Sequence, residues 1–366
     1  MTAKNIMTWV DRVFKSAWKR HRKTLSLLII ACFRGPRLSL TSLGRQLPVS
    51  TVPKHAIKRV DRFLGSRHFD HTQAREDWAH FVLGKRRQVS IAVDWTKVRS
   101  WPVLAAGLVQ RGRTVPLLWS VADPKMLYKS QNAFEHAFFA WMASLLPDGV
   151  EATVLLDRGF KRVDIIRYLQ RYRLSFVIRT GGNVHVHSSE YTGRMDKLIS
   201  RRGVRKDLPD AVLRPSRPVG VRVVGYWAPG AKEPWLLMTD RSDALARIMA
   251  LYDQRFRIEE SFRDQKSWRY GMSLGHVLVH STDRLERLLL IAAIVTCLAM
   301  LVGAAARRRS LDKGYRANTV QSRSTHSDFT LGIHYAFRLK LKRTEYLPHL
   351  LPPCRVAVRA GAYGHG

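Results

Sequence analysis

Cysteine is scarce in this chain of 366 residues. Cys32, Cys297 and Cys354 are the only three, they lie far apart, and no two of them form a C-x-x-C pair. An odd number of dispersed cysteines argues against a disulfide framework and against a structural zinc site. The first 23 residues read as a basic amphipathic helix rather than a secretory leader. We therefore expect a protein of a reducing compartment, the cytoplasm.

Acidic residues are also few. Asp and Glu number 28 against 63 Lys and Arg, which gives a formal net charge of +35. The cations are spread along the whole chain, so a folded protein would repel itself unless a polyanion neutralised it. Nucleic acid is the expected partner, because neutralising phosphates releases counterions and drives association. An anionic membrane surface is the alternative.

A long run without charge occurs between Leu288 and Ala306, and its 19 residues are just enough to span a bilayer. The run is rich in Ala and has Arg at both ends, so it carries no clear topology signal. A helix buried on all sides within a core has the same composition. We expect such a core helix and no membrane association, and solubility without detergent at high salt would test this.

Residues 1–85 are expected to be helical and to bind DNA. Within them, SLTSLGRQLPVSTVPKHAIKRVDRFLG (39–65) resembles two short helices joined by a Pro-containing turn. The second would run from Lys54 to Leu64 and present Lys58, Arg59 and Arg62. This pattern predicts a helix-turn-helix DNA reader, and an ordinary pair of basic helices is the alternative.

The pattern changes at Gln88. Five apolar, strand-like runs follow, at 89–95, 101–109, 115–122, 152–157 and 175–180. A helical pattern with core aromatics at 130–146 and a second helical pattern at 161–172 lie between the later strands. The order β-β-β-α-β-α-β predicts an α/β fold, a mixed sheet with helices on both faces.

Residues 184–239 interrupt this order and read as a β-rich insertion. Strand-like pieces at 219–227 and 234–240 follow a Pro-rich basic stretch at 207–218. We therefore predict five segments: 1–85, a core in two parts at 86–183 and 240–310, the insertion at 184–239, and a basic tail at 311–366.

Two carboxylates end apolar strands, Asp94 in SIAVD and Asp157 in TVLLD. Neighbouring strands would bring them together at one sheet edge, as in many α/β sites, and Glu259 on a packed helix could join them. Converging carboxylates need a cation, and hard oxygen ligands favour Mg²⁺ or Mn²⁺. Two such ions about 4 Å apart can drive phosphoryl displacement. A turn or helix cap is the alternative role for each Asp.

The segment YDQRFRIEESFRDQK carries the most specific pattern. Tyr252, Arg255, Glu259 and Lys266 lie at offsets near whole helical turns, so a single α-helix would place them on one face. Glu260 would point about 100° away, which favours Glu259 as the ligand. A solvated face with i,i+4 ion pairs is the alternative.

This pattern resembles the Tyr-Arg-Glu-Lys signature of one subgroup of bacterial insertion-sequence transposases of the DDE class. Asp94 in AVDWTKV, Asp157 in LLDRGF and the apolar run after the signature also match. The spacings of 63 residues between the two Asp, and of 102 from Asp157 to Glu259, suit a core with an insertion. The resemblance covers roughly residues 85–305.

The resemblance implies an RNase H-like catalytic core with a β-rich insertion, in which Asp94, Asp157 and Glu259 bind two Mg²⁺ ions, for which Mn²⁺ can substitute. It implies metal-dependent cleavage of double-stranded DNA at the element's terminal inverted repeats. The freed 3′-hydroxyl ends are then joined to target DNA within a homodimer, at the bacterial nucleoid. Tyr252, Arg255, Lys266 and Arg158 would contact DNA. Relatives can also hold a flipped base on an aromatic residue of the insertion, for which the candidates here are Trp227 and Trp235, although burial of each ring is the alternative.

Two other readings remain open from the sequence. A metal-dependent nuclease without strand transfer could have the same carboxylates, although the insertion argues against it. A DNA-binding relic without catalysis would be expected to have lost an acidic residue, and all three are present.

Overall fold

The computed structural model describes residues 1–213, 218–316, 319 and 324–340, which form two compact units. Unit 1 comprises Met1–Arg86, Trp95–Ser130 and the described residues from Glu259 onward, and unit 2 comprises Arg87–Asp94 and Gln131–Ile258. The described residues hold ten strands, mostly antiparallel, with flanking helices. This confirms the predicted mixed α/β class and is consistent with an RNase H-like core. The five-segment division stays a prediction, and most of its basic tail lies outside the described residues.

The first 85 residues are helical, as predicted. Their elements are α1 (Ala3–Val13), α2 (Lys19–Arg34), α3 (Leu40–Gln46), α4 (Pro53–Leu64) and α5 (His71–Leu83). Helix α4 begins within one residue of its predicted start, because Pro53 occupies the first turn, where no backbone N–H is needed. Cys32 is buried in α2, and burial raises the pKa of its thiol to about 12.

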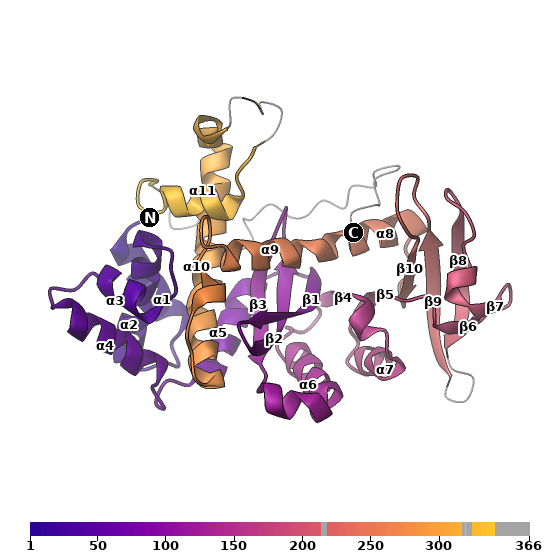
Figure 1. Cartoon of the computed structure of the whole chain (residues 1–366), viewed down its shortest axis with the longest axis horizontal. Coiled ribbons are helices and arrows are strands. Elements are labelled where there is room, and N and C mark those ends of the chain that lie inside the picture. Colours follow the sequence, from indigo (N-terminus) through magenta and orange to yellow (C-terminus); the bar gives the residue numbers. More distant parts are fainter. Residues whose placement is uncertain (214–217, 317–318, 320–323, 341–366) are drawn as a thin grey trace. The chain divides into compact units, whose positions relative to one another are not determined.

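Helices α3 and α4 form a closely packed pair (Figure 1). Ser39 caps α3 by accepting a hydrogen bond from the Ser42 backbone N–H. A Cβ atom placed on Gly44 of α3 would lie 2.6 Å from the Cα of Ile57 in α4, so only glycine allows this approach. The predicted arrangement of two short helices joined by a turn is therefore present.

Unit 1 also holds a β-hairpin of β2 (Trp101–Val109) and β3 (Thr114–Val121), closed by a hydrogen bond of 2.8 Å from the Gln110 N–H to the Arg113 carbonyl. Helix α10 (Thr282–Arg308) is the one described helix long and apolar enough to cross a membrane. Every residue from Leu285 to Ala306 is buried within the protein, which confirms the predicted core helix. The remaining elements are η4 (Leu274–His276), η5 (Leu311–Tyr315) and α11 (Asp328–Tyr335), of which α11 packs on α10.

Unit 2 is built on a sheet in the order β1-β4-β5-β10-β9-β8-β6-β7. Only the pairs β1–β4 and β4–β5 are parallel among the described strands. The strands after β5 continue the same sheet, so the β-rich segment extends it instead of forming a separate layer. Their bounds are β1 (Gln88–Val98, of which the last four residues belong to unit 1), β4 (Glu151–Leu156), β5 (Ser175–Arg179), β6 (His185–His187), β7 (Thr192–Arg194), β8 (Arg205–Leu213), β9 (Val219–Tyr226) and β10 (Trp235–Thr239).

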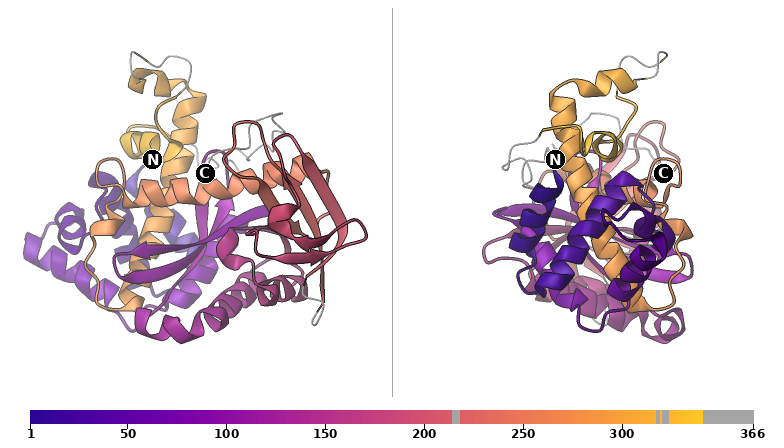
Figure 2. Two further views of the ribbon diagram at one scale, coloured as in Figure 1. Left: turned by 45° about the vertical axis from the view of Figure 1, so that its right-hand side comes forward. Right: turned by 90° about the vertical axis from the view of Figure 1, so that its left-hand side faces the viewer.

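The β-rich segment begins with more strand than its sequence pattern marks. Strand β8 covers Arg205–Leu213 and runs antiparallel beside β9, as two views show (Figures 1 and 2). Pro209 lies where the register shifts between Leu208 and Ala211. A proline is tolerated at such a bulge, because its missing N–H is not needed for the ladder.

The helical elements between β3 and η4 are α6 (Pro124–Ser144), η1 (Arg158–Phe160), α7 (Val163–Arg171), η2 (Met195–Lys197), α8 (Leu245–Asp253), η3 (Gln254–Phe256) and α9 (Arg257–Lys266). Helix α6 begins six residues before the predicted start at Ser130. Its first two turns are exposed, Met126 and Tyr128 among them, so no regular core-facing period marks them in the sequence. The order β-β-β-α-β-α-β is confirmed.

Candidate active site

The register of β1 and β4 places Asp94 and Asp157 at equivalent positions. The two strands are parallel, and their last paired residues are Val93 and Leu156. Asp94 and Asp157 follow directly, each one residue beyond this pair. Because neighbouring strands lie about 4.8 Å apart, the backbones of the two aspartates are close where the pairing of β1 with β4 ends. This juxtaposition was predicted from the two apolar strands.

Asp94 does not end its strand, since β1 continues to Val98. It stands where the pairing of β1 with β4 stops, and its side chain is 16% exposed. The guanidinium of Arg255 lies 3.5 Å from its Oδ2 atom, so a cation already partly compensates this carboxylate.

Asp157 lies in the tight turn after β4 and caps η1. Its Oδ1 atom accepts a hydrogen bond of 2.8 Å from the backbone N–H of Gly159. The cap role that the sequence left open is therefore real, and it fixes the carboxylate at the end of the strand. A cap of this kind uses one oxygen and orients the other.

An ion pair with one buried partner supports the same turn. Arg162 donates to the Gly159 carbonyl at 3.2 Å and also to the carboxylate of Glu135 in α6. Glu135 is completely buried, and Gln131 donates to it at 2.9 Å. The chain of contacts Glu135–Arg162–Gly159–Asp157 was missed from the sequence. The sequence feature that could have revealed it is Glu135, the one acidic residue in a helical segment rich in aromatic side chains.

The prediction that the signature residues occupy one α-helix is wrong. Tyr252 lies in α8, Arg255 lies in η3, and Glu259 and Lys266 lie in α9. The Gln254 N–H bonds to the Leu251 carbonyl three residues earlier, which winds the chain more tightly than an α-helix. The period of 3.6 residues therefore does not run unbroken from Tyr252 to Lys266.

Tyr252 and Arg255 are interior residues of unit 2. Tyr252 is 0% exposed, and its ring meets Trp235 edge-on with centroids 5.0 Å apart. Burial raises the pKa of the Tyr252 phenol. Arg255 is 5% exposed, and its guanidinium lies 4.4 Å from the centroid of the Phe256 ring. Neither side chain is at the surface of this structure, so their predicted contact with DNA requires a rearrangement and stays a prediction.

Helix α9 carries the other two signature residues in unit 1. Glu259 is exposed, whereas Glu260 pairs with Arg263 at 2.8 Å and lies 3.6 Å from Arg113. The amine of Lys266 lies 2.5 Å from the hydroxyl of Thr96. Glu259 and Lys266 are seven residues apart on one α-helix, about two turns, so they share a face.

The carboxylates suit a hard divalent cation, although the described residues contain no cluster of three or more His, Cys, Asp or Glu that could hold a metal ion. Asp94 and Asp157 lie at equivalent positions of two neighbouring parallel strands, and each carries carboxylate oxygens. Such oxygens are the ligands that Mg²⁺ prefers. Glu259, the predicted third ligand, belongs to unit 1.

The remaining predicted DNA-binding residues lie on two elements. Arg158 in η1 is about half exposed and pairs with Glu233, which also accepts a bond of 2.7 Å from Arg179. On α4, two of the predicted side chains are exposed, and the third is half-buried with its guanidinium 3.4 Å from the Thr24 hydroxyl. The exposed pair is Lys58 and Arg62, and the half-buried residue is Arg59.

The two aromatic candidates of the β-rich segment differ in exposure. Trp235 is 4% exposed and packs on Tyr252, so burial, the alternative from the sequence, is confirmed for this ring. Trp227 is half-buried, and its indole donates to the Ala231 carbonyl at 3.1 Å.

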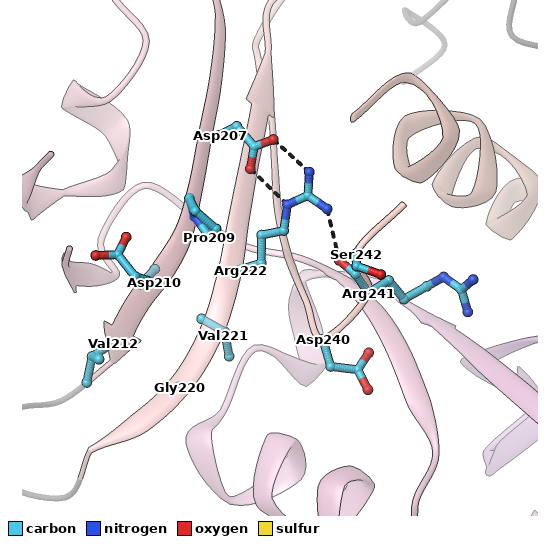
Figure 3. Close-up of a pocket in the computed structure, with 11 residues that line it drawn as sticks. Asp207, Pro209, Asp210, Val212, Gly220, Val221, Arg222, Asp240, Arg241 and Ser242 are labelled. Atoms are coloured by element: carbon cyan, nitrogen blue, oxygen red, sulfur yellow. Dashed lines mark hydrogen bonds and ion pairs between the residues drawn. The ribbon is translucent and has the colours of Figure 1, made fainter. Parts of the chain in front are cut away.

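An open hollow of about 580 Å³ lies between β8, β9 and the turn after β10 (Figure 3). Arg222 and Asp207 form a two-pronged ion pair across it, with contacts of 2.8 and 2.6 Å. Arg222 also donates to the Arg241 carbonyl at 3.0 Å. These charges satisfy one another, and no residue predicted from the sequence lines the hollow.

Comparison with known proteins supports a DDE-class transposase. Residues 128–298 match the family model of the transposase DDE domain. The matched range contains Asp157 and the whole signature, whereas Asp94 precedes it. A search of curated proteins gives no match. A domain of this class implies an enzyme that acts on DNA, and the basic composition of the chain agrees with this.

Proposed function

We propose that this protein is a cut-and-paste transposase of the Tyr-Arg-Glu-Lys subgroup, encoded by a bacterial insertion sequence. It cleaves DNA at the terminal inverted repeats of its element and joins the freed 3′-hydroxyl ends to target DNA. The observation that carries this proposal is the parallel pairing of β1 with β4, which sets Asp94 and Asp157 side by side. The transposase DDE match over residues 128–298 supports it.

Asp94, Asp157 and Glu259 are the proposed ligands of two Mg²⁺ ions, which Mn²⁺ can replace. When bound, such ions activate a water or 3′-hydroxyl nucleophile and stabilise the departing oxygen. Asp157 is held ready by its bond to the Gly159 N–H, and Arg255 compensates the charge of Asp94. The third carboxylate, Glu259, is exposed on α9 and is therefore accessible to a metal ion.

The proposed DNA contacts fall into two sets. Lys266 and Arg158 would bind phosphates near the cleaved end, and Lys266 already presents its amine as a donor to Thr96. Helix α4 of the α3–α4 pair would read the terminal repeat, with Lys58 and Arg62 exposed for backbone contacts. A homodimer would hold both ends of the element.

Tyr252 and Arg255 are assigned a second role beside the predicted DNA contact. Tyr252 packs on Trp235, and Arg255 lies on the Phe256 ring. These contacts would hold η3 in the position that brings Arg255 next to Asp94. Replacing Arg255 by Lys keeps the charge but loses the planar guanidinium that lies on the Phe256 ring.

The test is Mg²⁺-dependent cleavage of a labelled duplex carrying the DNA that flanks this gene. Wild type is compared with Asp94→Asn, Asp157→Asn and Glu259→Gln, and with Glu260→Gln as the matched control on the same helix turn. We expect the first three variants to bind the duplex within about twofold of wild type and to lose cleavage by at least a hundredfold. Glu260→Gln should retain cleavage, because its carboxylate is engaged with Arg263.

Two outcomes would contradict the assignment. Equal loss of binding and cleavage would show that the carboxylates maintain the fold instead of holding metal. Loss of cleavage in Glu260→Gln with activity retained in Glu259→Gln would exchange the roles of the two glutamates. If wild type binds the duplex but never cuts it, the protein is a DNA-binding relic.

A further inference from the structure

The segment that follows α9, residues 267–281, presents two large aromatic side chains to solvent. Trp268 is 58% exposed and Tyr270 is 66% exposed. An exposed tryptophan leaves a large apolar ring surface in water, and such rings are enriched where proteins bind partners. The pair lies within four residues of Lys266.

The loop that carries these rings is firmly anchored. Met272 is 0% exposed, and its carbonyl accepts a hydrogen bond of 3.0 Å from the Leu38 N–H. A Cβ atom on Gly271 would lie 1.7 Å from the Asp264 carbonyl oxygen, so the loop folds directly back on α9. Leu274 is also buried. The two aromatic rings are therefore exposed on a backbone that is already fixed, so less conformational entropy of the loop is lost when a ligand binds.

The segment that carries the two rings is basic. No Asp or Glu occurs from Gln265 to Thr282. The guanidinium of Arg269 lies 5.0 Å from the centroid of the Trp268 ring, and the Arg263 side chain on α9 is 72% exposed. Aromatic faces interleaved with cations are the pattern by which proteins bind unpaired nucleotides, because each base stacks on a ring while cations neutralise its phosphate.

We propose that Trp268 and Tyr270, with Arg269, form a stacking platform for unpaired bases of DNA. This inference rests on the proposed function, since it takes DNA as the substrate, and it adds a preference for single-stranded nucleotides next to a duplex end. Bases within a duplex are stacked on one another and offer no free face, so only unpaired bases can use these rings. The lack of acidic residues within the segment 267–281 favours a polyanion over a protein as the occupant.

The experiment measures the affinity of the full-length protein for two fluorescent DNAs without divalent metal. One is a blunt duplex, and the other is the same duplex with three unpaired nucleotides at its 3′ end. We expect wild type to prefer the extended duplex, and Trp268→Ala and Tyr270→Ala each to weaken binding of that DNA about tenfold. Binding of the blunt duplex should change by less than about twofold. Trp268→Phe should restore most of the preference, because phenylalanine keeps a stacking face.

Tyr128→Ala is the matched control, since Tyr128 is 88% exposed on α6 but lies outside this segment. It should bind both DNAs as wild type does. Equal affinity of wild type and Trp268→Ala for the extended duplex, with unchanged circular dichroism melting, would overturn the platform. A similar loss for both DNAs would also overturn it, because it would assign the rings to duplex or protein contacts.

Failure of the platform can be distinguished from failure of the proposed function. If wild type cleaves its flanking DNA while Trp268→Ala keeps full affinity for the extended duplex, only the platform is wrong. If wild type does not cleave, yet the preference for unpaired bases depends on Trp268, the platform stands and the transposase assignment is wrong.

Discussion

Replacing Arg162 by methionine should lower the stability of unit 2 and also loosen the position of Asp157, and a second variant distinguishes the two effects. Arg162 pairs with Glu135, which is completely buried, and it also donates to the carbonyl of Gly159. The Gly159 N–H in turn holds the carboxylate of Asp157. Methionine fills a similar volume but leaves the Glu135 carboxylate buried without its cation.

The magnitude follows from the burial of the two partners. Breaking a fully buried ion pair by removing one member costs about 3–5 kcal/mol. The Arg162 side chain is 33% exposed, so solvent screens part of the interaction, and a loss of about 2 kcal/mol is the better figure. For a unit of this size that corresponds to a fall in Tm of about 5 °C.

The double variant Glu135→Leu with Arg162→Met provides the control. Removing both charges should recover stability to within about 1 kcal/mol of wild type, because no buried carboxylate is left unpaired. Cleavage should remain about tenfold slower than wild type in both variants, since the Gly159 carbonyl has lost its donor and the Asp157 turn is less fixed. Recovery of cleavage together with stability in the double variant would refute the positioning role.

Three further predictions follow from single contacts. Gly44→Val should melt several degrees lower and lose DNA binding, because its side chain would overlap Ile57, whereas Gly220→Val, which has open space, should not. Burial raises the pKa of Glu286 to about 7. The protonated side chain therefore contributes to the free energy of unfolding fully below about pH 4.5, and this contribution is lost as the pH rises through about 7. Glu286→Gln should flatten the change in the urea midpoint over that pH range. Lys58→Ala should lower the slope of log affinity against log salt by about one, and an unchanged slope would exclude a phosphate contact.

The sequence predicted the part of the fold that depends on apolar periodicity. Strands β4 and β5 and the first half of β1 are mostly apolar, and α10 contains a long charge-free run, so each was recognised from its pattern. The side-by-side position of Asp94 and Asp157 followed, because two carboxylates after two buried strands are expected at one sheet edge.

Three features were not predicted because they depend on hydrogen bonds and contacts that leave no periodic pattern of apolar residues in the sequence. The tight turn η3 divides the signature between elements without any proline or glycine to mark it. Strand β8 was missed because Pro209 normally argues against a strand, and only the partner β9 shows that a bulge accommodates it. The pairing of Glu135 with Arg162 joins residues 27 positions apart, so it required the tertiary structure.

The measurement that most directly tests the central claim is strand transfer by pre-cleaved ends. A labelled duplex with a free 3′-hydroxyl at the element end is incubated with the protein, Mg²⁺ and a supercoiled plasmid. Wild type and Glu260→Gln should give labelled joint products, and Glu259→Gln should give none. Nicked plasmid without joined label in the wild-type reaction would contradict the account and identify a nuclease that hydrolyses DNA without transferring it.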